Sequence, residues 1–159
     1  MWEAGQPAPA ARAIYDSLPS RRRAAWAADV LDLACSRLPS VPAPVRAVVE
    51  LGRAGNLRSA HTAFSAVRDL TLAADGAGDR GVYAAVLGIA EDAAKVMYNA
   101  SGVVEPVPPG VKAPFDEECG YWLAGGLAHL ARASGSVEFA RAAWAVHQAW
   151  LTRPWWRFW

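Results

Sequence analysis

Apolar residues recur along most of this chain at the three- and four-residue spacing of an α-helix, and glycine, proline or serine separates one such segment from the next. No long run alternates apolar and polar positions with β-branched residues, as a half-buried β-strand would. The pattern predicts helices over about residues 9–17, 21–37, 44–54, 57–74, 80–99, 116–133 and 137–151. We therefore expect an all-α protein, a single-domain bundle of six or seven helices spanning residues 1–159.

Several helix ends carry recognisable capping residues. Ser20 and Ser136 precede two predicted helices, and a serine hydroxyl can accept a hydrogen bond from a backbone N–H of the first turn. Asp79 is expected to cap the helix that runs to about Asn99. Gly135 suits the end of the helix before it.

The apolar stripes of two helices predict where the core lies. In the second helix the stripe is Ala27, Val30, Leu31, Ala34 and Leu38, and in the fifth it is Val82, Val86, Ile89, Ala93, Val96 and Met97. His147 falls among apolar and aromatic residues of the last helix, where a lone histidine is more often a core residue than a ligand.

Three segments lie outside the predicted helices: an N-terminal arm (1–8), a loop with four prolines (103–114) and a C-terminal tail (152–159). The tail contains Trp155, Trp156, Arg157, Phe158 and Trp159. Aromatic residues this dense rarely stay in water. They could fold back over the bundle, bind a partner or a second copy of the chain, or sit at a membrane interface.

The charge and the cysteine content argue against a nucleic-acid-binding protein and against a disulfide-stabilised one. The net charge is +1, and the longest run of like charge is three arginines, so the basic stripe of a nucleic-acid binder is absent. Two cysteines, Cys35 and Cys119, do not make a disulfide framework. Cys35 falls near the core side of its helix and is expected to be a small buried hydrophobe. With no leader pattern and no apolar run long enough to span a bilayer, we expect a cytoplasmic protein.

Residues 116–122, DEECGYW, form the most distinctive segment. Its three acids suit the first turn of a helix, where the helix dipole favours negative charge. On the same helix Glu118, Trp122, Gly125 and His129 share one stripe. Glu118 and His129 are roughly 16 Å apart along the axis, too far to act as one acid–base pair, but they could flank a ligand.

A second polar group lies on the fifth helix, where Asp92, Lys95 and Asn99 share a flank beside the apolar stripe. Together with Glu118, Trp122 and His129 they could line a pocket between the fifth and sixth helices. The alternative is that they form a solvated face. No metal-ligand spacing, phosphate-binding loop or nucleophile motif occurs, so we assign no catalytic residue, no metal and no cofactor.

The segment AAWAADVL (24–31), which follows an arginine cluster, and the alanine-rich helices of residues 59–74 and 83–98 resemble actinobacterial helical immunity proteins of polymorphic toxin systems. The likeness covers about the first hundred residues. It implies that the protein binds and blocks a cognate toxin, and it transfers no site residues.

The sequence thus predicts a protein-binding module, of the immunity type or one that associates with itself, with no nucleic-acid partner. The alternative is a small helical enzyme or ligand-binding protein that uses the pocket between the fifth and sixth helices. A structural subunit joined through the Trp-rich tail is a third reading.

Overall fold

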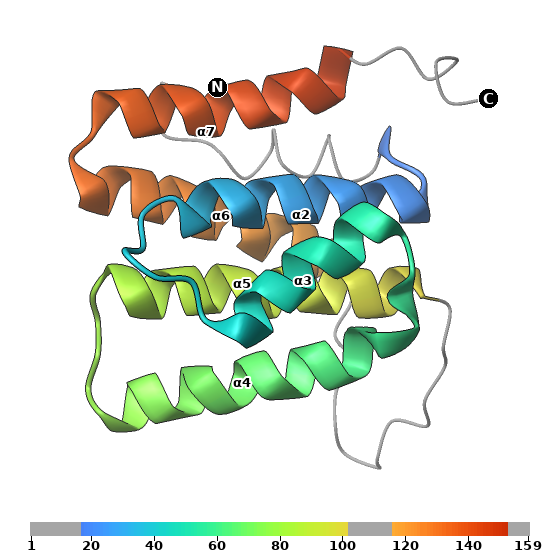
Figure 1. The fold of residues 1–159 in the computed structure, drawn as a ribbon. Coiled ribbons are helices and arrows are strands. Elements are labelled where there is room, and N and C mark those ends of the chain that lie inside the picture. The colour runs from blue at the N-terminus through green and yellow to red at the C-terminus, as the bar shows by residue number, and fades with distance from the viewer. Residues whose placement is uncertain (1–16, 102–115, 153–159) are drawn as a thin grey trace.

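The computed structural model of the protein describes residues 17–101 and 116–152, so the arm, the proline-rich loop, nearly all of the first predicted helix and the aromatic residues of the tail lie outside the described residues (Figure 1). Within these ranges there are six α-helices and no strand. They are α2 (Ser20–Cys35), α3 (Ala43–Ala54), α4 (Ala60–Gly76), α5 (Val82–Ala100), α6 (Asp116–Ser134) and α7 (Val137–Thr152), with a 3₁₀ turn η1 (Leu57–Ser59) before α4. The predicted all-α bundle is confirmed.

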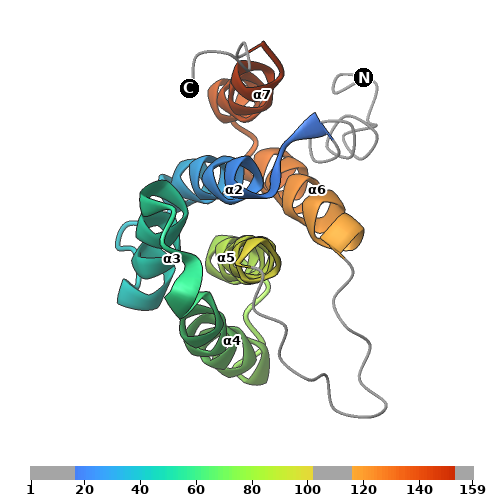
Figure 2. The same cartoon turned by 90° about the vertical axis from the view of Figure 1, so that its right-hand side faces the viewer.

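Helix α5 lies at the centre of the bundle. Helices α2, α3, α4 and α6 surround it, and α7 lies outside this arc, against α2 and α6 (Figure 2). The central position explains why α5 is buried on most of its sides, well beyond the single stripe that the sequence predicted. Of that stripe, all but Val82 are buried, and Val82 is half-buried at the first position of the helix.

The helix ends are set partly by side chains and partly by proline. Ser136 Oγ accepts a hydrogen bond from the Phe139 amide at 3.1 Å, which confirms it as the cap of α7. The assignment of Ser20 as the cap of α2 is wrong, because Pro19 holds that position and Ser20 is the first helical residue. The Pro19 carbonyl accepts the amides of Arg22 and Arg23, and proline's fixed φ suits this entry to a helix.

Two other ends also differ from the expectation. Asp79 does not cap α5 directly: Gly81 is the N-cap, and Asp79 Oδ1 accepts the Gly81 amide at 2.7 Å in the turn before the helix. Thr152, which the sequence assigned to the tail, is the last residue of α7.

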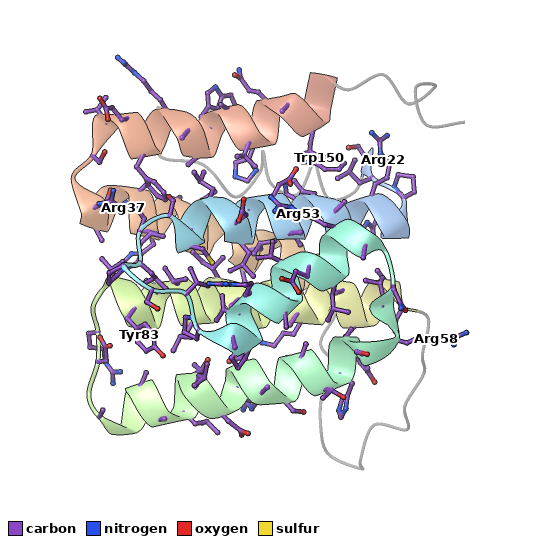
Figure 3. All side chains as sticks on the ribbon, in the orientation of Figure 1. Arg22, Arg37, Arg53, Arg58, Tyr83 and Trp150 are labelled. Atoms are coloured by element: carbon purple, nitrogen blue, oxygen red, sulfur yellow. The ribbon has the colours of Figure 1, made fainter. Side chains whose placement is uncertain are left out.

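Helix α7 is attached to α2 by aromatic side chains that also make polar contacts. Trp26 Nε1 donates to His147 Nδ1 at 3.3 Å, and Trp150 Nε1 donates to Asp29 Oδ2 at 2.9 Å. Trp26 and His147 are almost fully buried, so the prediction of His147 as a core residue is confirmed. The Arg22 guanidinium stacks over the Trp150 ring, where the two lie between α7 and the start of α2 (Figure 3).

Two glycines allow helices to approach closely. A Cβ added at Gly52 of α3 would lie 2.7 Å from the Ala24 carbonyl oxygen and 2.5 Å from Met97 Cε. A Cβ at Gly126 of α6 would lie 2.9 Å from Ile89 Cγ1. A side chain at either position would force its neighbours to shift: backbone of α2 at Gly52, and the Ile89 side chain at Gly126.

We expect Gly52→Ala to lower the free energy of unfolding by about 1–3 kcal/mol, because the new methyl group must displace backbone of α2. The matched control is Gly88→Ala, at which an added Cβ meets nothing within 4 Å. Because glycine is a poor helix former, this control should be neutral or stabilising by up to about 1 kcal/mol. Urea unfolding followed by circular dichroism measures both variants, and equal effects would contradict the packing described for Gly52.

Candidate functional site

The side chains of Asp92 and Lys95, both predicted from the sequence, meet on the side of α5 that faces α4. Lys95 Nζ lies 3.4 Å from Asp92 Oδ1 and 3.2 Å from Glu91 Oε1. Arg68 of α4 reaches Glu91 Oε1 at 2.8 Å. Two carboxylates and two cations thus form one network that ties α4 to α5, and Glu91 and Arg68 join the two residues that the sequence selected.

Burial changes the protonation of this network. It raises the pKa of the Asp92 carboxyl to about 6, because the opposing effect of Lys95 only partly offsets desolvation and Glu91 adds to the rise. For Lys95, burial lowers the pKa, but the Asp92 and Glu91 carboxylates outweigh it and the net pKa is raised. Lys95 therefore stays charged near neutral pH, and the Asp92 carboxyl titrates at about pH 6.

The α6 residues of the predicted pocket lie on a different surface. Trp122 is 57% exposed, His129 is exposed, and a Cβ at Gly125 would meet nothing within 4 Å. This stripe lies to one side of Gly126, the position at which α6 rests on Ile89 of α5.

Asn99 and Glu118 are the other two residues of the predicted pocket. Asn99 is half-buried near the end of α5. Glu118 lies in the first turn of α6, and its side chain is outside the described residues. The structure therefore brings Asp92 and Lys95 together and sets Trp122 and His129 on an exposed flank, and a shared ligand for the six residues stays a prediction.

The sequence did not reveal a groove on the outer side of the bundle, where α3 meets η1 and α4. Its volume is about 610 Å³. The two helices run obliquely to each other and are joined through η1, and they lie farther apart at the η1 end than at the start of α3 (Figure 1). The lining residues are mostly small and apolar: Ala43, Pro44, Ala47, Glu50, Leu51, Ala54, Asn56, Ser59, Thr62, Ala63 and Ala66.

The groove stays open because the side chains on its walls are short. Along α3, positions 43, 47, 50 and 54 follow each other at spacings of four, three and four residues. This is the spacing of a coiled-coil seam, which packs against a neighbouring helix. Here the seam lies on the side of α3 opposite its buried residues Val45, Val48 and Val49. Three of the four seam positions are alanine, so the seam presents shallow holes and no knobs.

Glu50 is the charged residue among those that line the groove. It is exposed, and it takes part in no ion pair within residues 17–101 and 116–152. The nearby Arg53 is directed elsewhere, because its Nη2 lies 2.7 Å from Asp32 Oδ2 and 4.0 Å from Asp29 Oδ1 on α2. The groove therefore combines apolar walls with one carboxylate that makes no ion pair with a described residue.

The described residues do not meet the requirements of a metal site, a reactive cysteine or a membrane-spanning helix. No group of three or more histidine, cysteine, aspartate or glutamate side chains there is arranged to hold a metal ion. Cys35 is buried, as predicted, and burial raises the pKa of its thiol to about 11, with Asp32 adding to the rise and Arg46 opposing it. At neutral pH the thiol is protonated and so a weak nucleophile. Among the described helices, none combines the length and the hydropathy needed to cross a membrane.

Comparisons with protein-family models, with curated proteins and with solved structures return no match to this chain.

Proposed function

We propose that the protein is a protein-binding module that receives a helix of a partner protein in the groove of α3, η1 and α4. The observation that carries this proposal is the open groove of about 610 Å³, whose walls are mostly small and apolar residues. A contiguous apolar hollow on a protein surface is typical of an interaction site.

A helix suits this groove better than an extended strand. An extended segment gains affinity by hydrogen bonding to a sheet edge, and the described residues contain no strand. Helix-in-groove recognition instead needs apolar walls about as long as the bound helix. Helix α3 has 12 residues and so offers a wall about 18 Å long, which matches some three turns of a partner helix. Short side chains on the walls let such a helix bring large apolar residues into the groove.

The biological role that we propose is that of an immunity-like inhibitor, which blocks its partner by occupying a helix of it. The resemblance of the alanine-rich segments to helical immunity proteins supports this role. A groove on the outer face, away from the central helix α5, also suits it, because the bundle can bind without rearranging its core.

Ala47→Trp tests the proposal by filling the groove. Ala47 is exposed on the seam of α3, so the new indole should occupy the groove without disturbing the core. We expect helical peptides selected from a display library against the wild-type protein to bind this variant at least about tenfold more weakly, a loss of about 1.4 kcal/mol. Fluorescence anisotropy measures the affinities.

The matched control is Ala145→Trp, at an exposed position of α7 far from the groove along the chain. It adds the same side chain to another surface and should leave the affinity of the selected peptides unchanged. If the tightest peptides bind Ala47→Trp as well as they bind the wild type, the groove is not the binding site and the proposed function fails.

A further inference from the structure

We propose that the partner helix carries a lysine or arginine on its apolar face, placed to pair with Glu50. This inference rests on the proposed function and adds the charge and the register of the partner. It follows from the position of Glu50 in the seam, from the ion pairing of the surrounding carboxylates, and from the electrostatic cost of covering a lone charge.

Glu50 occupies a central position along α3. Glu50 lies three residues after Ala47 and four before Ala54, so it belongs to the seam itself and not to its rim. A helix bound along α3 would therefore cover the carboxylate near the middle of its contact. A polar residue inside such a seam restricts which register two helices can adopt, because only one alignment gives it a partner.

Ion pairing within the protein leaves Glu50 available to a partner. Asp32 and Asp75 on the described surface have cations beside them, Arg53 and Arg80, and the buried Glu91 has Arg68 and Lys95. Glu50 makes no ion pair with a described residue, and unlike Asp69 and Glu138, which also make none, it lines the apolar groove. Within the described residues, Arg53 pairs with Asp32, and Arg46, one turn before Glu50 on α3, makes no ion pair with it, so the covered carboxylate would need a cation from the partner.

Covering the Glu50 carboxylate with a helix has an electrostatic cost. A purely apolar helix would remove water from the Glu50 carboxylate without offering it a hydrogen bond or an ion pair. A buried unpaired charge is strongly unfavourable. A helix with an acidic residue at this point would add like-charge repulsion. A basic residue on a long aliphatic stem avoids both penalties, because its stem can lie along the alanines while its charge reaches the carboxylate.

The experiment uses the full-length protein and a display library of amphipathic helical peptides with randomised face positions. We expect the selected peptides to be enriched in lysine or arginine at one position between large apolar residues. Glu50→Gln should weaken their binding about tenfold or more, as removal of one partner of a covered charge pair does. Glu50→Lys should weaken it further.

A charge exchange completes the test. A selected peptide in which the basic residue is changed to glutamate should bind the wild type poorly and Glu50→Lys at least tenfold better than it binds the wild type. Because Glu50 is exposed, both variants should fold as the wild type does, which circular dichroism can verify.

The outcomes separate the two proposals. If Ala47→Trp abolishes binding while the Glu50 variants and the exchanged peptide bind as the wild-type pair does, the groove is correct and the inference about charge is overturned. If Ala47→Trp has no effect, the proposed function itself fails, whatever the Glu50 variants do. Enrichment of acidic or uncharged peptides would likewise overturn the inference about charge.

Discussion

Replacing Trp26 with alanine is expected to lower the free energy of unfolding by about 3–5 kcal/mol, because it removes a fully buried aromatic side chain and leaves a cavity behind it. The indole has a second role: its N–H donates to His147 Nδ1 and so links α2 to the peripheral helix α7. Trp26→Ala therefore removes packing from the core and leaves a buried acceptor without its donor. Urea unfolding followed by circular dichroism is the measurement.

Two further variants make this prediction specific. Trp122→Ala removes the same side chain from a position that is 57% exposed, and it should cost less than about 1 kcal/mol. Trp26→Phe retains most of the ring volume and loses the hydrogen bond, so its cost should fall between those of the two alanine variants. It also gives a result if Trp26→Ala does not fold. Equal costs at Trp26 and Trp122 would contradict the assignment of Trp26 to the core.

Acid is expected to destabilise the protein through His147. Burial lowers the pKa of this imidazole to about 4, from an ordinary value of 6.5. Between these two values the unfolded chain binds a proton that the folded protein does not, so stability falls as the pH falls. The contribution of His147 is intact above about pH 6.5 and is lost progressively down to about pH 4, by about 3 kcal/mol in all.

The measurement is the free energy of unfolding of the wild type and of His147→Gln at a series of pH values from 4 to 7. Glutamine can still accept the Trp26 hydrogen bond but does not titrate, so the difference between the two proteins isolates the imidazole. His129→Gln, at an exposed position, should keep the wild-type pH dependence. If His147→Gln loses stability in acid as steeply as the wild type, His147 is not the titrating group.

Asp92 acts in the opposite direction and must be separated from this effect. Its pKa is raised to about 6 from 3.8, so the folded state holds the proton more tightly. The stabilisation that this gives is present below about pH 3.8 and is lost as the pH rises through about 6. The wild type therefore shows the sum of two opposed trends, and Asp92→Asn should steepen its loss of stability in acid.

The sequence was sufficient to predict the helices because their signals are local. The apolar spacing and the breaks at glycine and proline placed the described α-helices within about three residues of their observed ends. The error at Ser20 has a physical cause, since a proline just before a serine can itself hold the cap position. The central place of α5 was not predictable in the same way, because it depends on which helices pack around it.

In the candidate sites, too, contacts within one helix could be predicted from the sequence, and contacts between helices could not. Asp92 and Lys95 lie three residues apart on one helix, so their pairing follows from helix geometry alone. Arg68 joins them from α4, and no local spacing reveals that contact. The groove depends on the angle between α3 and α4, which no local pattern specifies. Its alanine residues are equally compatible with a buried and with an exposed position, so they do not identify the walls of a groove. A 4-3-4 spacing of residues 43, 47, 50 and 54, opposite the stripe of buried valines, was the one available signal.

The central claim is that the groove of α3, η1 and α4 is the binding face. Backbone amide hydrogen exchange tests it most directly, with and without a saturating helical peptide selected against the whole protein. The account predicts slower exchange over residues 43–54 and 59–66, with little change over residues 122–134 and 137–152. Slower exchange confined to α6 or α7, with α3 and α4 unchanged, would contradict it.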